Sequence, residues 1–189
     1  MQRNRAVFCD RDGVLIRDCG YLHDPDRIEI LDGVPAAIRL LNESGFLSLV
    51  VTNQSGVARG YFSENIVQRT HAAISKRLAE AGAHIDAFYY CPHYPDAVVP
   101  AYKQDCDCRK PKPGMILRAA ETWGIDLSKS FMVGDKGSDV EAGKAVGART
   151  LLILPEGGQR TSPDQESAFT QQPDWVATDL LEAVQWILQ

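Results

Sequence analysis

The 189-residue sequence lacks any apolar run long enough to cross a membrane. Its longest apolar stretches, such as Phe46–Val51 with a serine inside it and Leu151–Leu154, fall far short of the roughly 20 residues that a membrane helix needs. Near the start of the chain only four uncharged residues, Ala6–Cys9, separate charged ones, which is too few for the apolar region of a signal peptide. We therefore expect a cytoplasmic protein with no membrane partner.

The sequence also lacks an excess of positive charge. Its 20 Lys and Arg residues are outnumbered by 25 Asp and Glu residues, for a net charge of −5, which argues against a nucleic-acid partner. A small anionic substrate remains compatible, because a binding site needs only a few local cations. The content of 44% hydrophobic and 24% charged residues is typical of a soluble globular protein and excludes the disordered and fibrous classes. The length predicts a single domain over residues 1–189, and we expect a monomer.

Cysteine is scarce and odd in number, with five in the chain, which disfavours a disulfide framework. A Cys-x-His pair and a Cys-x-Cys pair supply four ligands: Cys91, His93, Cys106 and Cys108. Three thiolates and one imidazole complete a tetrahedral zinc site with no open position, so we predict a structural Zn²⁺ within residues 91–108. Cys106 and Cys108 are too close in sequence for an easy mutual disulfide, and a catalytic cysteine would lack a partner histidine outside the cluster. Cys9, in an apolar run, is predicted to be a small core residue.

Five short runs rich in β-branched and aromatic residues alternate with segments of helical periodicity. The predicted strands are residues 5–9, 46–51, 87–90, 130–133 and 148–154. The predicted helices are residues 33–44, 63–81 with Ser63 as N-cap, a segment that follows Pro113, 138–146 and 178–188. This order predicts an α/β fold with a parallel sheet covered on both faces. Two segments break the rhythm: Cys91–Pro113, and Pro155–Asp174, which is predicted to be a surface loop.

Charged residues follow the predicted strands, where ligands bind in an open parallel sheet. A carboxylate such as Asp10 can attack phosphorus and form an aspartyl-phosphate. Each pair of like unit charges ~4 Å apart costs ~4 kcal/mol at an effective dielectric of ~20, so cations must offset the repulsion. Asp10 and Asp135 from neighbouring strand ends would form an oxygen-rich Mg²⁺ site, and Lys110 would add a positive charge.

Further groups near these positions suit phosphoryl transfer. Thr52, with the amide groups of Asn53 and Gln54, follows the second strand and could donate hydrogen bonds to a phosphate. Asp12 lies two residues after Asp10 on a turn that Gly13 permits. It could protonate the leaving oxygen and later deprotonate the attacking water. A binding module with this fold would be expected to lack Asp10 or Asp135. Both residues are present, which favours an enzyme.

Four motifs in this order resemble those of the haloacid dehalogenase (HAD) superfamily of phosphohydrolases. They are the Asp10/Asp12 pair, Thr52, Lys110 and the Asp135/Asp139 acidic motif, between about Val7 and Leu154. The resemblance implies a Rossmann-like fold and a Mg²⁺-dependent phosphoric monoester hydrolase. The chain leaves no room for a large cap domain, so the zinc loop and short neighbouring loops would select the substrate.

Longer stretches resemble the heptose 1,7-bisphosphate 7-phosphatase family within that superfamily. They read Cys-Pro-His-Tyr-Pro, Cys-Asp-Cys-Arg-Lys-Pro, Thr-Asn-Gln-Ser-Gly-Val-Ala-Arg-Gly and Val-Gly-Asp-Lys. Histidinol-phosphate phosphatases share the zinc loop and many of the residues in these stretches. The segment Asp18–His23 and the absence of a partner catalytic domain favour the heptose family. The implied reaction removes the 7-phosphate of the β anomer during synthesis of lipopolysaccharide core precursors; the α anomer, histidinol phosphate and a DNA-end phosphatase stay open.

The resemblance also implies a role for each site residue. Asp10 would be the nucleophile and a Mg²⁺ ligand, Asp12 the proton donor and a ligand through its carbonyl, and Asp135 the remaining protein ligand. Arg109 would recognise the far phosphate. The residues expected to bind substrate are Asp18, Cys19, Gly20, Tyr21, Thr52, Asn53, Gln54, Ser55, Arg109, Lys110 and Lys136. Lys112, where one branch of the superfamily commonly has a histidine, could compete with Lys110 for its role.

Overall fold

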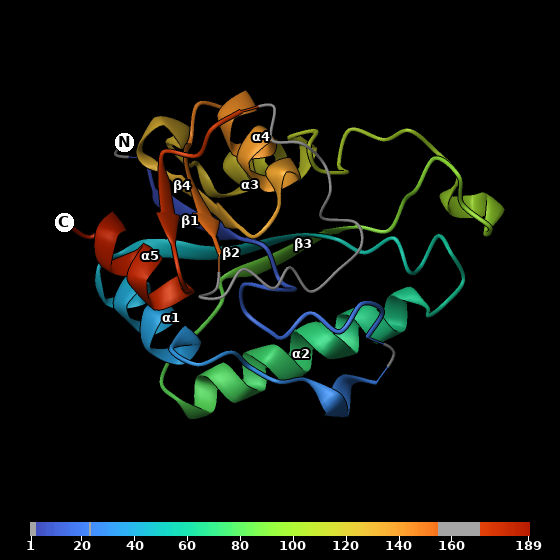
Figure 1. The fold of residues 1–189 in the computed structure, drawn as a ribbon, viewed down its shortest axis with the longest axis horizontal. Helices are drawn as coiled ribbons and strands as arrows, with labels where there is room; N and C mark the ends of the chain where they lie inside the picture. The colour runs from blue at the N-terminus through green and yellow to red at the C-terminus, as the bar shows by residue number, and fades with distance from the viewer. Residues whose placement is uncertain (1–2, 23, 155–170) are drawn as a thin grey trace.

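The alternating pattern of strands and helices folds into one parallel sheet with the order β3-β2-β1-β4-β5-β6 (Figure 1). The computed structural model describes residues 3–22, 24–154 and 171–189. The strands are β1 (Arg5–Cys9), β2 (Phe46–Asn53), β3 (Ala87–Cys91), β4 (Phe131–Gly134), β5 (Arg149–Ile153) and β6 (Trp175–Ala177). The five predicted strands are confirmed, with ends that differ by at most about two residues.

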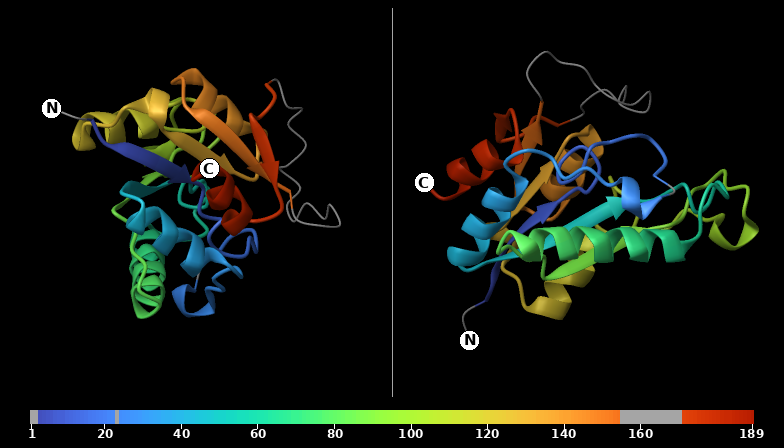
Figure 2. Two further views of the ribbon diagram at one scale, coloured as in Figure 1. Left: turned by 90° about the vertical axis from the view of Figure 1, so that its left-hand side faces the viewer. Right: turned by 90° about the horizontal axis from the view of Figure 1, so that it is seen from below.

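Helices cover both faces of the sheet, as predicted (Figure 2). One face carries α1 (Val34–Glu43), α2 (Glu64–Glu80) and α5 (Leu180–Ile187), and the other carries α3 (Gly114–Trp123) and α4 (Gly137–Ala145). Short 3₁₀ helices occupy Pro25–Arg27, Pro100–Tyr102 and Leu127–Lys129. Ser63 does precede α2, but its side chain makes no capping hydrogen bond. Asp179 caps α5 by accepting from the backbone N–H of Glu182, so this helix begins two residues later than predicted.

Strand β1 shows why its sequence is almost continuously apolar. Val7 and Cys9 pack into the cluster beneath α1, α2 and α5, while Ala6 and Phe8 pack into the cluster beneath α3 and α4. Successive side chains point to opposite faces of a strand, and both faces of this sheet are buried. Cys9 is therefore a core residue, as predicted. Burial raises the pKa of its thiol to about 12, so Cys9 stays protonated at neutral pH.

The sixth strand, β6, was not predicted from the sequence. Trp175–Ala177 is only three residues long and pairs in parallel with β5 at the edge of the sheet, where Trp175 and Val176 remain exposed. Most of the predicted surface loop 155–174 lies outside the described residues, as does His23 of the predicted substrate segment. Among the helices that are described, none has the length and apolar character required to span a bilayer.

The order of the strands places a crevice beyond the carboxyl ends of β1 and β4. From β1 the chain continues to β2 on one side, and it returns as β4 on the other side, so the connections diverge at this point. Two connections also extend beyond this edge of the sheet: β2 to α2, and β3 to α3 (Figure 1). The backbone N–H of Val99 joins them by donating to the carbonyl of Ala58 at 2.9 Å. Together they form one wall above the crevice.

Candidate active site

Asp10 and Lys110 form a buried ion pair at the end of β1. The ammonium of Lys110 lies 3.0 Å from Asp10 Oδ1 and 2.6 Å from Asp139 Oδ1, and it donates to the carbonyl of Val51 at 2.7 Å. Burial by itself would raise the pKa of Asp10 and lower that of Lys110. The attraction between the opposite charges outweighs burial in both cases, so the pKa of Asp10 is lowered and that of Lys110 is raised. Both groups are therefore charged at neutral pH.

Three carboxylates gather beside Lys110. One oxygen from each of Asp10, Asp135 and Asp139 lies within 4.8 Å of the others. Burial raises the pKa of Asp135 to about 8, and the charge of Asp10 contributes to this rise although Lys136 opposes it. A divalent cation would stabilise the ionised forms, and oxygen ligands of this kind suit Mg²⁺. The donor set therefore suits a magnesium ion. It contains two of the predicted ligands, Asp10 and Asp135, and adds Asp139, which the sequence did not assign to the metal.

Two glycines let the chain approach these carboxylates closely. Gly13 has φ of +83°, and a Cβ atom there would lie 2.5 Å from Asp135 Oδ2. A Cβ atom at Gly134 would lie 2.2 Å from the Cβ of Asp139. Any side chain at either position would displace a carboxylate. The turn that the sequence predicted at Gly13 is confirmed, and its role extends to making room for Asp135.

Asp12 is held by two neighbours on the same turn and on the next strand end. Arg11 Nη2 lies 3.0 Å from Asp12 Oδ1 and 2.9 Å from Oδ2, and Gln54 Nε2 donates to Oδ2 at 2.9 Å. The same Gln54 nitrogen donates to Thr52 Oγ1 at 2.9 Å. Arg11 is not among the site residues predicted from the sequence. The sequence nevertheless contains an indication of its role. Arg11 lies between Asp10 and Asp12 at the end of a buried strand, and a buried arginine needs an acidic partner.

Asn53 and Gln54 use their amide groups differently from the prediction that these groups bind phosphate. Asn53 Nδ2 donates to the carbonyl of Lys110 at 3.0 Å, and the N–H of Lys110 donates back to Asn53 Oδ1 at 3.0 Å. The backbone N–H of Gln54 donates to the carbonyl of Cys91 at 2.8 Å. These amides hold the architecture of the site, because the loop from β3 needs anchors where it crosses the end of β2.

An open cleft of about 430 Å³ lies next to Asp12 and Lys110. Its lining includes Asp12, Asp18, Gly20, Tyr21, Asn53, Gln54, Ser55, Arg109, Lys110 and Lys136, all of them among the predicted site residues. Lys136 Nζ lies 3.6 Å from Asp18 Oδ2 and 3.7 Å from Asp135 Oδ2, so it ties the substrate segment to the metal ligands. Cys19 instead lines a neighbouring hollow. The size suits a small phosphorylated molecule.

Arg109 is the cation at the mouth of this cleft. Its guanidinium lies over the ring of Tyr94, 4.9 Å from the centroid, and donates to the carbonyl of His93 at 3.5 Å. Lys112 points elsewhere and forms an exposed ion pair with Asp105 at 2.6 Å. Lys110, and not Lys112, therefore provides the buried cation next to Asp10.

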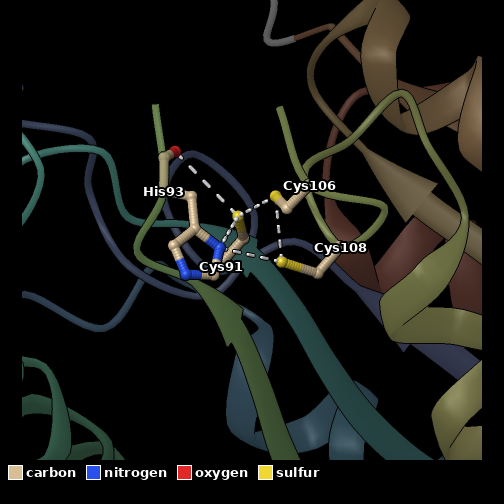
Figure 3. Close-up of side chains that lie close together, drawn as sticks. All are labelled: Cys91, His93, Cys106 and Cys108. Carbon is tan, nitrogen blue, oxygen red and sulfur yellow. Dashed lines mark hydrogen bonds between the residues drawn. The ribbon is translucent and has the colours of Figure 1, made fainter. Parts of the chain in front are cut away.

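The four predicted zinc ligands converge at one point between β3 and α3 (Figure 3). The Sγ of Cys106 lies 3.4 Å from that of Cys91 and 3.2 Å from that of Cys108, while His93 Nδ1 lies 3.4 Å from Cys108 Sγ and 3.8 Å from Cys91 Sγ. A zinc tetrahedron with Zn–S bonds of ~2.3 Å has edges of roughly 3.5–3.8 Å. These side chains therefore could hold Zn²⁺ after small adjustments.

The chain resembles characterised proteins along almost its entire length. Residues 107–183 match the HAD-hydrolase-like family. Relatives named D-glycero-beta-D-manno-heptose-1,7-bisphosphate 7-phosphatase include that of Escherichia coli (strain K12), 42% identical over 96% of this chain and 93% of its own. That of Pasteurella multocida (strain Pm70) is 43% identical over 87% of this chain and 89% of its own. The crystal structure of D,D-heptose 1.7-bisphosphate phosphatase from B. bronchiseptica, complexed with magnesium and phosphate, has a TM-score of 0.83 at 32% identity and covers 98% of both chains.

Proposed function

Because the chain belongs to the HAD-like heptose-1,7-bisphosphate 7-phosphatase family, we propose that it hydrolyses the 7-phosphate of D-glycero-beta-D-manno-heptose 1,7-bisphosphate. The products are heptose 1-phosphate and inorganic phosphate, in the synthesis of lipopolysaccharide core precursors. The observation that carries the mechanism is the buried Asp10, paired with Lys110 at the crevice between β1 and β4. The chain is a phosphoric monoester hydrolase, and its single domain contains the zinc loop of residues 91–108.

In the first proposed step, a carboxylate oxygen of Asp10 attacks the phosphorus of the 7-phosphate. A bond forms between this oxygen and phosphorus, and the bond from phosphorus to the sugar oxygen breaks. Protonated Asp12 delivers its proton to that oxygen, which leaves as the neutral alcohol. Lys110 and the hydroxyl of Thr52 bind the oxygens of the phosphoryl group during transfer.

In the second step, water attacks the phosphorus of the aspartyl-phosphate on Asp10. The carboxylate of Asp12 accepts a proton from the water, the bond between phosphorus and Asp10 breaks, and inorganic phosphate is released. Asp12 is again protonated and Asp10 is again ionised. The enzyme returns to its starting state without a further reactant.

The cofactors of this proposal are a catalytic Mg²⁺ and a structural Zn²⁺. When bound, Mg²⁺ supplies positive charge that offsets the repulsion between a carboxylate nucleophile and a phosphate. Asp10, Asp135 and the backbone carbonyl of Asp12 would hold it. Zn²⁺ would bind the loop ligands Cys91, His93, Cys106 and Cys108. That loop places Arg109 and Lys110 directly after its last ligand.

Substrate recognition is proposed to depend on groups at both ends of the cleft. The 7-phosphate lies at Asp10, and the guanidinium of Arg109 binds the 1-phosphate with two hydrogen bonds. The residues that contact the sugar are Asp18, Gly20, Tyr21, Ser55 and Lys136, all of which line the cleft. Arginine suits the second phosphate because its planar group matches the geometry of phosphate oxygens.

We further propose that the enzyme acts as a monomer in the cytoplasm, without a nucleic-acid partner. A reducing compartment suits Cys91, Cys106 and Cys108, whose sulfur atoms must be reduced to bind the proposed Zn²⁺. Thiols that lie as close together as these would be prone to oxidise outside such a compartment.

The test is a phosphate-release assay with Mg²⁺ on both anomers of heptose 1,7-bisphosphate, histidinol phosphate and fructose 1,6-bisphosphate. The β anomer is expected to have the highest kcat/KM. A preference of several orders of magnitude for histidinol phosphate would overturn the substrate assignment and leave the mechanism intact. Asp10→Asn is expected to abolish turnover, with exposed Asp26→Asn as the matched control. Full activity in Asp10→Asn would refute the mechanism.

A further inference from the structure

Arg11 is a buried arginine that lies beneath the cleft and does not line it. Only 2% of the residue is exposed, and its guanidinium contacts both oxygens of Asp12. Arg11 Nη2 also donates to Gln54 Oε1 at 2.9 Å. The guanidinium thus bridges the proposed acid–base residue and a glutamine from the end of the neighbouring strand.

A guanidinium has hydrogen-bond donors and no acceptor, and this property fixes the orientation of the Gln54 amide. The oxygen of Gln54 must face Arg11, so its nitrogen must face away from Arg11. In that orientation Nε2 donates to both Asp12 Oδ2 and Thr52 Oγ1, each at 2.9 Å. The flipped amide would place two donors against each other and would lose both of these hydrogen bonds.

The orientation of Gln54 in turn determines what Thr52 offers to a substrate. Because Thr52 Oγ1 accepts a hydrogen bond from Gln54, its own hydrogen is available for an acceptor in the site. A phosphoryl oxygen is such an acceptor. The carboxylate of Asp12 is held at the same time by Arg11 and Gln54, which restricts its rotation.

We propose that Arg11, acting through Gln54, is a positioning residue that holds Asp12 for proton transfer and directs the hydroxyl of Thr52 toward the phosphoryl group. The inference rests on the proposed function, because it assigns a support to the acid–base residue of that mechanism. Arg11 touches no substrate atom. Its effect on catalysis depends on five hydrogen bonds: from Arg11 to both oxygens of Asp12 and to Gln54, and from Gln54 to Asp12 and to Thr52.

The leaving group separates positioning of Asp12 from a merely structural role. A sugar alkoxide is a poor leaving group and depends on the proton from Asp12, whereas p-nitrophenolate is stable enough to leave without it. A variant that misplaces Asp12 should therefore be slow with heptose bisphosphate and much less impaired with p-nitrophenyl phosphate. A variant that only disturbs folding would lose both activities to the same extent.

The experiment compares kcat and KM of Arg11→Lys and Arg11→Met on heptose 1,7-bisphosphate and p-nitrophenyl phosphate. We expect kcat/KM, which reports the first step and not the hydrolysis of the aspartyl-phosphate that both substrates share, to fall by about 10²–10³-fold on the sugar substrate and by less than about tenfold on the aryl phosphate. Arg17→Met is the matched control, since Arg17 forms an exposed ion pair with Glu29 at 2.7 Å. It should retain both activities.

A second variant keeps the test decisive if Arg11 variants fold poorly. Gln54→Met retains the shape of the side chain and removes the hydrogen bonds of the Gln54 amide to Arg11, Asp12 and Thr52. It should show the same large loss on the sugar substrate and small loss on the aryl phosphate. In an Asp12→Asn background, Arg11→Lys should cause little further loss on the sugar substrate, because the group that it positions is already disabled. Equal losses on both substrates, or full additivity with Asp12→Asn, would overturn the inference. If the wild type does not hydrolyse heptose bisphosphate, the proposed substrate is wrong, and the same comparison is made with β-glycerophosphate as the alkyl phosphate.

Discussion

The side chain of Asn53 and the backbone of Lys110 form a reciprocal pair of hydrogen bonds, each 3.0 Å long. Asn53 ends β2, and Lys110 comes two residues after the last proposed zinc ligand. This pair therefore joins the sheet to the loop that delivers the buried cation to Asp10. It explains how a long connection from β3 can hold one ammonium group within 3.0 Å of a carboxylate.

Removal of this pair should affect catalysis as well as stability. Asn53→Ala leaves two backbone groups of Lys110 without these partners, so we expect a loss of about 1–3 kcal/mol in the free energy of unfolding and at least a tenfold decrease in kcat. Asn42 makes the same kind of pair with the backbone of His84, at 3.1 and 3.0 Å, far from the site. Asn42→Ala should lose similar stability but keep its kcat. Equal kcat in the two variants would contradict the role of Asn53.

Lys110 and Lys112 provide a direct test of which lysine serves the site. Lys110→Met removes the cation next to two buried carboxylates, and we expect kcat/KM to fall by about 10²–10³-fold. Lys112→Met removes only an exposed ion pair with Asp105 and should stay within about twofold of the wild type. Steady-state kinetics on one substrate measures both. A larger loss in Lys112→Met would reverse the assignment.

Loss of zinc should lower stability and activity together. Cys106→Ser removes one of four ligands, and we expect zinc content to fall, the melting temperature to drop by roughly 6–12 °C for a loss of about 3 kcal/mol, and turnover to decrease as Arg109 and Lys110 lose their support. Metal analysis, calorimetry and phosphate release measure these changes. Cys9→Ala, outside the cluster, should keep its zinc. Unchanged turnover in Cys106→Ser despite lost zinc would separate the metal from substrate recognition.

The approach of Gly13 to Asp135 predicts a catalytic effect that backbone strain alone would not produce. Gly13→Ala adds a Cβ atom 2.5 Å from Asp135 Oδ2, so kcat should fall by more than tenfold, with a raised requirement for Mg²⁺. Gly82 has a similar φ of +72° with no atom near its Cβ position. Gly82→Ala should show only the strain of about 1–2 kcal/mol. A normal Mg²⁺ dependence in Gly13→Ala would show that Asp135 tolerates the displacement.

His71 predicts a loss of stability in acid. Its ring is buried and stacks on Phe88 with centroids 4.5 Å apart, and burial lowers its pKa to about 3. Unfolding restores an ordinary pKa near 6.5, so the unfolded chain binds more protons below that pH. The contribution of His71 is complete above about pH 6.5 and is lost progressively as the pH falls toward 3, by about 2 kcal/mol between pH 7 and pH 5.

Urea unfolding at pH 7 and pH 5 measures this contribution. His71→Leu should lose about 2 kcal/mol less than the wild type between these two pH values, because it has no proton to bind at this position. His84→Gln is the control, since His71 is still present and the wild-type dependence should remain. Identical pH dependence in His71→Leu and the wild type would refute the prediction.

The sequence by itself determined most of the sheet and which polar side chains gather at one edge of it. Apolar runs such as Arg5–Cys9 can be recognised because both faces of a parallel strand are buried, and the residues that follow them must meet at one edge. The cluster of Cys91, His93, Cys106 and Cys108 could be recognised from the residue types and their spacing alone. Strand β6 could not be recognised in this way. It has only three residues, and Trp175 and Val176 are exposed at the edge of the sheet, so its sequence shows no pattern of buried apolar residues.

Only the tertiary structure decided which polar groups line the cleft and which bind each other. Lys110 and Lys112 are only two residues apart in the sequence, and the loop geometry buries one of them beside Asp10 and leaves the other exposed beside Asp105. Gln54 lines the cleft, and the donor-only guanidinium of Arg11 fixes its amide toward Asp12. Hydrogen-bond partners depend on distances and directions between residues far apart in the chain, and local sequence patterns carry no such information.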